Sequence, residues 1–283
     1  MKNGFRVLVA ILTLVPLVLP GAAGASSPSG SEGKSKVRAR LVADAADVGP
    51  GGTLHLGVVF DIDPGWHIYW RNPGGAGLAT EVLWELPEGL EAGDLGWPLP
   101  IAFDQSEGIP GYGYQGTVML ASEIHSDVAV DFAAEIGAAV SWLACKDVCV
   151  LGSAELAGAL GDLAESSEGF QRWQRDLPRS LDPGKPPFSV TTTGGLGEGR
   201  LTLWVRWPEA PGQVEWFPDP SEGLKVEVLG VRTRAALTRI DVAVQQINGD
   251  ATGPPRLDSV VVVTDARGRR GWKLDVDLEN DKP

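Results

Sequence analysis

The chain contains two cysteines, Cys145 and Cys149, and three residues separate them: Lys146, Asp147 and Val148. A closely spaced pair can exchange electrons with another protein, because one thiolate attacks a disulfide and the second thiol resolves the mixed disulfide. The charge of Lys146 would favour the thiolate form, whereas the charge of Asp147 would oppose it. This spacing indicates a centre for thiol-disulfide exchange.

Two other interpretations of the pair stay open. A structural disulfide closing this five-residue loop would restrict the unfolded chain by only about 2 kcal/mol, which is little for a protein of this size. Two thiolates and a histidine could instead hold Cu(I) or Zn(II). The histidines are His55, His67 and His125, and none lies within four residues of the pair. Since only folding could bring one close, we predict no metal site and no cofactor, with copper binding as an alternative.

The elements that must position the cysteines have the pattern of short strands. Gly- and Pro-rich turns separate strand-like runs at 37–43, 53–61, 66–70, 80–86, 117–124, 128–132 and 137–145, and the cysteine pair follows the last run. Several short strands at this spacing indicate a β-sandwich. A helix is predicted over 162–176, where Phe170 and Trp173 share one face.

A second series of strand-like runs follows a Pro-rich segment. Residues 178–187 contain four prolines and are typical of a linker. Residues 188–283 contain neither cysteine nor histidine, so we expect this half to support the first or to dock a partner. The predicted fold is all-β, with tandem sandwich domains at 37–177 and 188–283 and one short helix before the linker.

The first 25 residues have the pattern of a secretory signal peptide. Lys2 and Arg6 precede an apolar run over 7–19, and Ala23-Gly24-Ala25 resembles a cleavage site. The run is too short for a membrane span, and no comparable apolar run of 18 residues follows. We therefore expect export, with residues 26–36 as a flexible lead-in.

Composition excludes two further classes of protein. The chain has 37 acidic and 24 basic side chains, a net charge of −13, and no basic cluster, which argues against a nucleic-acid partner. Its hydrophobic content of 43% and its ten tryptophans can build real cores, which excludes wholesale disorder.

Four segments in order carry a family resemblance: GWHIYWRNPGGAGLAT (65–80), WELPEGLEAGDLGWPLP (84–100), GYGYQGTVML (111–120) and VSWLACKDVC (140–149). They resemble the N-terminal periplasmic domain of the DsbD family of thiol:disulfide interchange proteins, over about residues 37–176. The cysteine spacing is similar to that of the ScsB branch, which is associated with copper-stress tolerance. The second β-domain is similar to an extra domain of ScsB-like proteins.

The resemblance implies immunoglobulin-like sandwiches and a role for each cysteine. Carried over by position, Cys149 is the nucleophile and Cys145 the resolving thiol. The family also covers its cysteines with a cap loop that bears an aromatic residue. The corresponding loop here is 101–116, and the candidate cap residues, each with core packing as an alternative, are Phe103, Tyr112 and Tyr114.

Four other residues in the first of these segments have simpler interpretations. Trp66 and Trp70 alternate with other residues as in a half-buried strand, which predicts core packing. Arg71 and Asn72 precede a Pro-Gly-Gly turn, and we expect them to hold that turn rather than to touch a substrate.

The function implied is that of a protein-disulfide reductase component in the periplasm. It would pass electrons to thioredoxin-like exported oxidoreductases, in oxidoreductase maturation, cytochrome c biogenesis or copper-stress tolerance. In the family, a membrane domain and a thioredoxin-like domain lie on the same polypeptide. This sequence stops at Pro283 without them, so a separate membrane reductase is the expected donor. The rival hypothesis is a non-redox immunoglobulin-like binding module with an inert disulfide.

Overall fold

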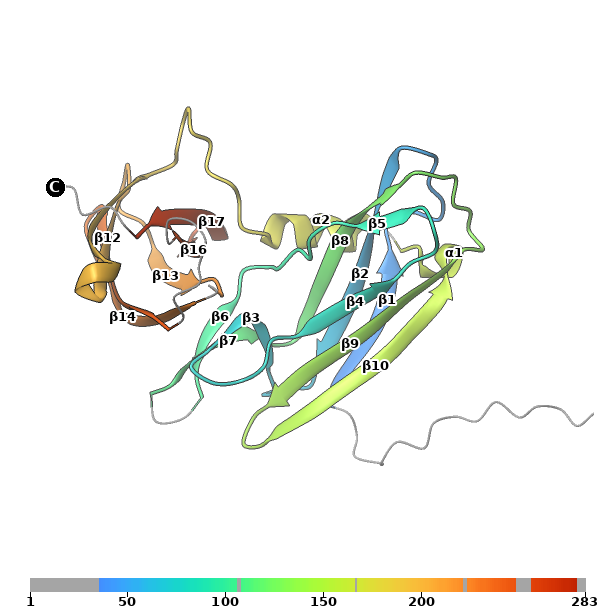
Figure 1. The fold of residues 1–283 in the computed structure, drawn as a ribbon, viewed down its shortest axis with the longest axis horizontal. Coiled ribbons are helices and arrows are strands. Elements are labelled where there is room, and N and C mark those ends of the chain that lie inside the picture. The colour runs from blue at the N-terminus through green and yellow to red at the C-terminus, as the bar shows by residue number, and fades with distance from the viewer. Residues whose placement is uncertain (1–35, 106–107, 166, 221–222, 248–255, 279–283) are drawn as a thin grey trace, which may run out of the picture. The chain divides into compact units, whose positions relative to one another are not determined.

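The computed structural model describes residues 36–278, apart from 106–107, 166, 221–222 and 248–255 (Figure 1). The predicted signal peptide, and the lead-in apart from Lys36, lie outside the described residues. Within the described part of the chain, no helix is long and apolar enough to cross a membrane.

Ten strands form three antiparallel sheets in the described residues before Leu160. The sheet orders are β1-β2-β8-β5, β10-β9-β4 and β3-β7-β6. The strands are β1 (Val37–Ala43), β2 (Gly52–Ile62), β3 (Ile68–Gly74), β4 (Glu81–Glu85), β5 (Leu90–Ala92), β6 (Ile101–Asp104), β7 (Pro110–Tyr114), β8 (Thr117–Ser126), β9 (Glu135–Cys145) and β10 (Cys149–Ala159).

The core of this half lies where side chains of β2 and β9 meet. Phe60 is fully buried, and its ring meets the edge of Trp142, with ring centroids 5.7 Å apart. Opposite Trp142, Gly152 of β10 leaves the space that the indole occupies, since an added Cβ would lie 2.4 Å from it. Inward-facing residues therefore anchor β9 and β10, and their alternate residues face outward.

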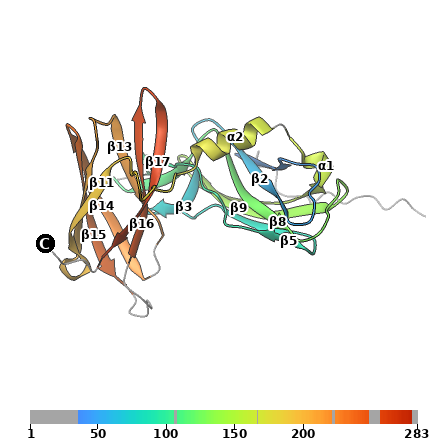
Figure 2. The same cartoon turned by 90° about the horizontal axis from the view of Figure 1, so that it is seen from above.

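The predicted helix over 162–176 is divided in two. Helix α1 (Leu160–Leu163) ends at Ala164, which has an extended backbone, and helix α2 (Ser167–Asp176) follows. Phe170 and Trp173 of α2 are buried together against Val42, Val59 and Ala121. Figure 2 shows α2 lying beside β2 and β8. The prediction that these two aromatic residues share a buried face is confirmed.

Residues after Phe188 form two further antiparallel sheets, ordered β11-β12-β15-β14 and β13-β16-β17. The elements are β11 (Ser189–Gly195), the 3₁₀ helix η1 (Leu196–Glu198), β12 (Arg200–Arg206), β13 (Gln213–Pro218), β14 (Leu224–Arg234), β15 (Leu237–Gln246), β16 (Arg256–Asp265) and β17 (Gly268–Asp277). The predicted all-β class with an immunoglobulin-like fold is confirmed.

The two groups of sheets share buried contacts. Phe217 of β13 packs edge-on against Trp70 and Tyr112, with centroid distances of 6.2 and 5.3 Å. Arg179, inside the predicted linker, pairs with Trp272 of β17 and so extends that sheet's hydrogen bonding. The domain boundaries at 177 and 188 stay predictions.

The structure differs from the sequence expectations about strands in several places, and the short strands β5 and β13 were not predicted. Residues 128–132 do not form a strand; Val130 makes an isolated bridge to Val48. The predicted loop over 101–116 contains the hairpin of β6 and β7. Strand β10 was not predicted, because its Gly, Ala and Ser residues have low β-propensity and pairing with β9 overrides that preference.

Candidate functional site

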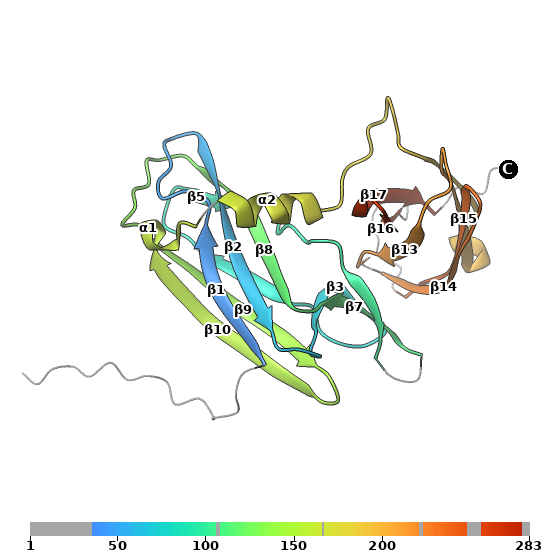
Figure 3. The ribbon, with the colours of Figure 1, turned by 180° about the vertical axis from the view of Figure 1, so that it is seen from behind.

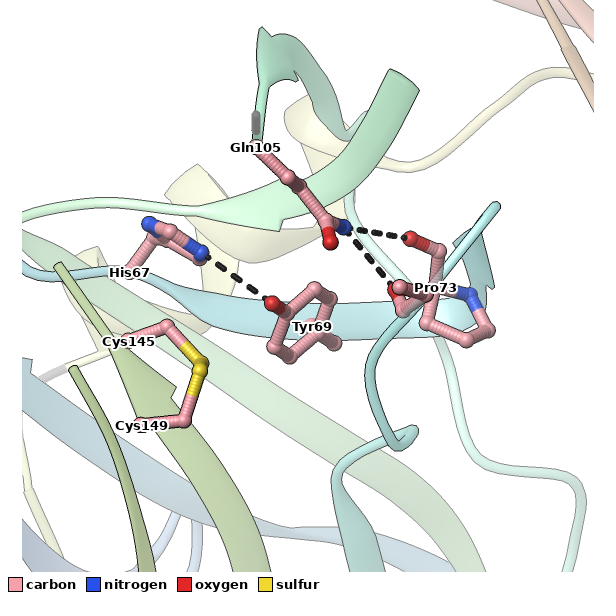
Figure 4. Close-up of a disulfide and its surroundings, with 7 residues drawn as sticks. His67, Tyr69, Pro73, Gln105, Cys145 and Cys149 are labelled. Atoms are coloured by element: carbon pink, nitrogen blue, oxygen red, sulfur yellow. Dashed lines mark hydrogen bonds between the residues drawn. A yellow bond between two sulfur atoms is a disulfide. The ribbon is translucent and has the colours of Figure 1, made fainter. Parts of the chain in front are cut away.

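A disulfide joins Cys145, the last residue of β9, to Cys149, the first residue of β10 (Figure 4). The two residues face each other in the antiparallel register, and a three-residue turn connects them. Figure 3 shows β9 and β10 running side by side to this turn. The cysteine pair therefore closes the tip of a long hairpin.

The two cysteines differ sharply in exposure. Cys145 is 3% exposed, whereas Cys149 is exposed to solvent. Cys145 lies between two neighbours, since its backbone also exchanges two 3.0 Å hydrogen bonds with His67. Cys149 lies at the edge of the sheet, where β10 has β9 as its one neighbour. The position of each cysteine in the sheet thus makes one sulfur accessible and the other protected.

His67, which pairs with Cys145, lies in a cluster of three aromatic side chains. The His67 ring lies 4.0 Å from the Phe103 ring and 5.2 Å from the Tyr69 ring, centroid to centroid. His67 Nε2 is 3.4 Å from the Tyr69 hydroxyl (Figure 4). Because His67 is directly opposite Cys145, its side chain points to the same side of the sheet as the disulfide. The fold therefore places an imidazole next to the buried cysteine.

Burial sets the protonation of this cluster. Desolvation lowers the pKa of His67 and raises the pKa of Tyr69, because both charged forms would lose water contacts. His67 is therefore neutral at pH 7. A neutral imidazole has one ring nitrogen that can accept a proton.

Hydrogen bonds hold the hairpin of β6 and β7 next to this cluster. Gln105 donates hydrogen bonds to the carbonyls of Ala76, at 2.8 Å, and Pro73, at 3.5 Å (Figure 4). Gly111 gives Phe103 room, because an added Cβ would lie 2.3 Å from that ring. These contacts hold Phe103 against His67.

The three candidate cap residues are not equivalent. Phe103 is half-buried in the aromatic cluster. Tyr112 packs on Phe217, and burial raises its pKa to about 12. Tyr114 is buried and donates a hydrogen bond to the Pro98 carbonyl. The structure thus brings Phe103 to the cluster next to the disulfide and places both tyrosines in the core.

The three histidines have different surroundings. His55 pairs with Asp44 at 2.7 Å, and the exposed His125 lies 3.6 Å from Asp127. His67 is the histidine that folding brings to Cys145, which its distance in sequence could not reveal. Across the described residues, no three His, Cys, Asp or Glu side chains are grouped as metal ligands would be.

Exposed large apolar residues flank Cys149 in the sequence. Val148, Val150 and Leu151 are 62%, 48% and 72% exposed. Clustered exposed apolar side chains mark interaction sites more often than the same residues scattered singly. Sequence reasoning missed this surface, although the run Val148-Cys149-Val150-Leu151 was its available signal.

The remaining predictions in this region met mixed results. Trp70 is 1% exposed and confirms its core position, and Trp66 is half-buried against the same core. Asn72 accepts a hydrogen bond from the Gly74 amide, which holds the turn as predicted. It also donates to the Pro218 carbonyl, and Arg71 pairs with Asp219 at 2.7 Å; neither long-range contact was predicted.

Lys146, at the hairpin tip, extends over a neighbouring turn. Its Cε and Nζ lie against Gly65: if that glycine carried a Cβ, each atom would be 3.3 Å from it. The predicted electrostatic help from Lys146 to a thiolate stays a prediction.

Comparisons with known proteins agree with this geometry. Residues 38–160 match the family model described as "Thiol:disulfide interchange protein DsbD, N-terminal". The chain is also similar in fold to the N-terminal periplasmic domain of ScsB from Proteus mirabilis, with a TM-score of 0.67 and 24% identity, over 90% of this chain and 97% of that chain.

Two other comparisons add nothing to this result. A structure described as the conserved domain protein from Bacillus anthracis aligns over 87% of this chain and 89% of that chain, with 12% identity and a TM-score of 0.19, too low to indicate a shared fold. No curated protein matches the chain. The family match and the geometry of the hairpin agree: residues 38–160 match the N-terminal domain of the DsbD thiol:disulfide interchange family and contain a disulfide-forming cysteine pair.

Proposed function

We propose that this protein is an exported thiol:disulfide interchange protein that passes electrons from its Cys145–Cys149 pair to thioredoxin-like proteins. The observation that carries this proposal is the unequal exposure of the two sulfurs. An exchange centre needs one accessible thiol to meet its partner and a second, adjacent thiol to release that partner. Cys149 is exposed and Cys145 is buried beside it, which supports these two roles.

The proposed reaction has two steps. The Cys149 thiolate attacks one sulfur of the partner's disulfide, forming a mixed disulfide and releasing a partner thiolate that takes up a proton. Cys145 then loses its proton and attacks Cys149 Sγ, which re-forms the intramolecular disulfide and releases the second partner thiolate. Two electrons and two protons pass to the partner, and an upstream dithiol must return the pair to its reduced state.

We assign His67 as the base that accepts the proton of the Cys145 thiol. It lies across the sheet from this cysteine and is kept neutral by burial. Phe103 and Tyr69 pack around the imidazole and limit its contact with water. In this scheme His67 accepts the Cys145 proton in the second step, and Phe103 serves as the cap.

Two observations support export to the periplasm. The first 25 residues have the pattern of a signal peptide, and the similar ScsB structure is described as periplasmic. Cell fractionation, with N-terminal sequencing of the mature protein, tests this part of the proposal. Recovery of an unprocessed chain in the cytoplasm would overturn it.

Trapping experiments test the cysteine roles. Cys145→Ser protein, mixed with an oxidised thioredoxin-like protein, is expected to accumulate a mixed disulfide through Cys149, because the resolving thiol is missing. The matched control is Cys149→Ser, which leaves the buried thiol and should trap little. Trapping by Cys149→Ser alone would reverse the assignment.

The reduction potential of the pair separates exchange from an inert disulfide. Structural disulfides in secreted proteins typically have potentials below about −300 mV, and labile exchange centres have higher ones. A potential above that value, measured against glutathione or dithiothreitol, supports the proposal. Cu(I) titration of the reduced protein in the same series tests the copper alternative.

A further inference from the structure

The outer edge of β10 is open beside the reactive cysteine. Cys145 directs its backbone N–H and C=O toward His67, away from β10, so Cys145 and Cys149 are a non-hydrogen-bonded pair. Backbone groups alternate sides along a strand. The backbone N–H and C=O groups of Cys149, Leu151 and Ser153 therefore point away from β9, to the free edge of the sheet.

These edge groups have no backbone partner in the described residues. The backbone hydrogen bonds outside regular pairing include none to Cys149, Leu151, Ser153 or Glu155. The same residues carry the exposed, outward side chains of β10, whereas Gly152 and Ala154 between them are half-buried. The open edge thus begins at the accessible cysteine and continues along the strand.

The edge also lacks the usual protection against pairing. Natural edge strands carry lysines, prolines, bulges or several charges that block the addition of another strand. Strand β10 has the sequence CVLGSAELAGA, in which Glu155 is the one charged residue. Its register with β9 runs without a break from Cys149 to Ala159.

We propose that the edge of β10 is the docking site for an extended segment of the redox partner, which adds as a strand beside Cys149. This inference rests on the proposed function and names how its partner binds. A row of free N–H and C=O groups at strand spacing is complementary to another extended backbone, a recognised mode of peptide binding. Because Cys149 is the first residue of this row, the added strand brings its own cysteine to the accessible sulfur.

A second copy of this chain is a poorer occupant. Each copy carries a net charge of −13, so two copies repel one another. A partner's redox segment needs no particular side chains, since backbone groups supply the hydrogen bonds. Exposed Leu151 and Val150 add apolar contact on the two faces of the edge.

Proline substitution tests the edge without touching either sulfur. Ser153→Pro removes an N–H that points to the free edge and leaves the ladder with β9 intact, because edge strands accept proline there. We expect the reduced variant to react five- to tenfold more slowly with an oxidised thioredoxin-like protein. Its reaction with oxidised glutathione, which is too short to form a strand, should be unchanged.

The matched control is Ala157→Pro, at the far end of the same edge. Ala157 has the same orientation as Ser153 but lies eight residues beyond Cys149. It should react at the wild-type rate with both oxidants. If Ser153→Pro and Ala157→Pro behave alike with the protein oxidant, the edge is not the docking site.

Peptide probes provide a test that depends on no variant. The probe is an extended nine-residue peptide whose single cysteine carries thionitrobenzoate in a mixed disulfide. Reduced Cys149 attacks the peptide sulfur, forms the protein–peptide disulfide and releases coloured thionitrobenzoate. Cys145 then displaces the peptide thiol and closes the disulfide.

Backbone N-methylation of this peptide blocks one edge at a time. Methylation two residues before and after its cysteine is compared with methylation one residue before and after it. We expect one methylated form to react at least fivefold more slowly than the other, whereas both should react equally with glutathione. Equal rates with the protein would overturn the docking proposal. No reaction of the wild-type pair with any oxidant would instead overturn the proposed function.

Discussion

Strands β10 and β14 have the same length and the same place at the edge of an antiparallel sheet, yet their sequences treat that edge differently. Strand β14 carries Lys225, Glu227, Arg232 and Arg234, and its register with β15 shifts between Val228 and Gly230. Strand β10 carries a single charged residue and keeps an unbroken register. Charges and a break in register are the devices that keep other strands away from an edge.

The difference distinguishes an edge strand that is protected against pairing from one that is available to bind another strand. The sheet of β14 lies in the half of the chain that has no cysteine or histidine, so no thiol there needs access to a redox partner. Strand β10 begins at an exposed cysteine. An unprotected edge risks aggregation, so its retention beside Cys149 is consistent with a binding role.

The largest expected effect on the exchange rate comes from removing the reactive thiol, which the edge of β10 has and the edge of β14 lacks. Cys149→Ser should lower the rate of exchange with a protein disulfide at least 100-fold, because the accessible thiolate is lost. The fold should persist, as measured by circular dichroism. A variant that retained more than a tenth of the wild-type rate would show that Cys145 itself attacks the partner's disulfide.

Making β10 resemble β14 should have the next largest effect. The double substitution Leu151→Lys with Ser153→Glu adds two charges of opposite sign at the open edge and leaves the net charge unchanged. We expect exchange with a thioredoxin-like protein to slow about tenfold, since both side chains obstruct an added strand. The rate with oxidised glutathione is the control, and an equal slowing there would indicate a local effect on the cysteines.

Making β14 resemble β10 is the reverse test. Lys225→Val with Glu227→Val removes two exposed charges from that edge. Self-association, measured by light scattering at increasing concentration, should rise several-fold, while exchange through Cys149 stays at the wild-type rate. Unchanged association would mean that the register shift alone protects β14.

Opening the disulfide should change stability only modestly. The bridge closes a five-residue loop, which corresponds to about 2 kcal/mol of unfolded-state restriction. The melting temperature of the reduced protein is therefore expected to fall by roughly 5 °C, with the β signal in circular dichroism preserved. Loss of that signal on reduction would favour a structural role for the pair.

The smallest effect concerns the pH dependence that His67 adds at the site. Burial lowers the pKa of His67 in the folded state, so the unfolded chain binds the proton first as pH falls. Stability is thus lost as pH drops below the ordinary histidine pKa of about 6.5 toward the lowered value. His67→Gln should flatten the fall in melting temperature between pH 7.5 and 5.5, and the exposed His125→Gln should not. Parallel curves for wild type and His67→Gln would contradict this assignment.

Local patterns in the sequence determined much of this protein. Alternation and turn residues predicted six of the seven strands after residue 188, all but β13, and most of the strands in the first half. The spacing of Phe170 and Trp173 predicted the buried face of α2. The four-residue cysteine spacing predicted a disulfide, which the structure contains. These features depend on residues close in the chain, where period and turn chemistry act directly.

Tertiary structure alone decided the character of the site. His67 is 78 positions from Cys145, and pairing of distant strands brings them opposite each other. The exposure of Cys149, the burial of Cys145 and the open edge of β10 follow from the order of strands in a sheet. That order is set by which apolar faces pack into one core, a long-range choice that no local window of sequence contains.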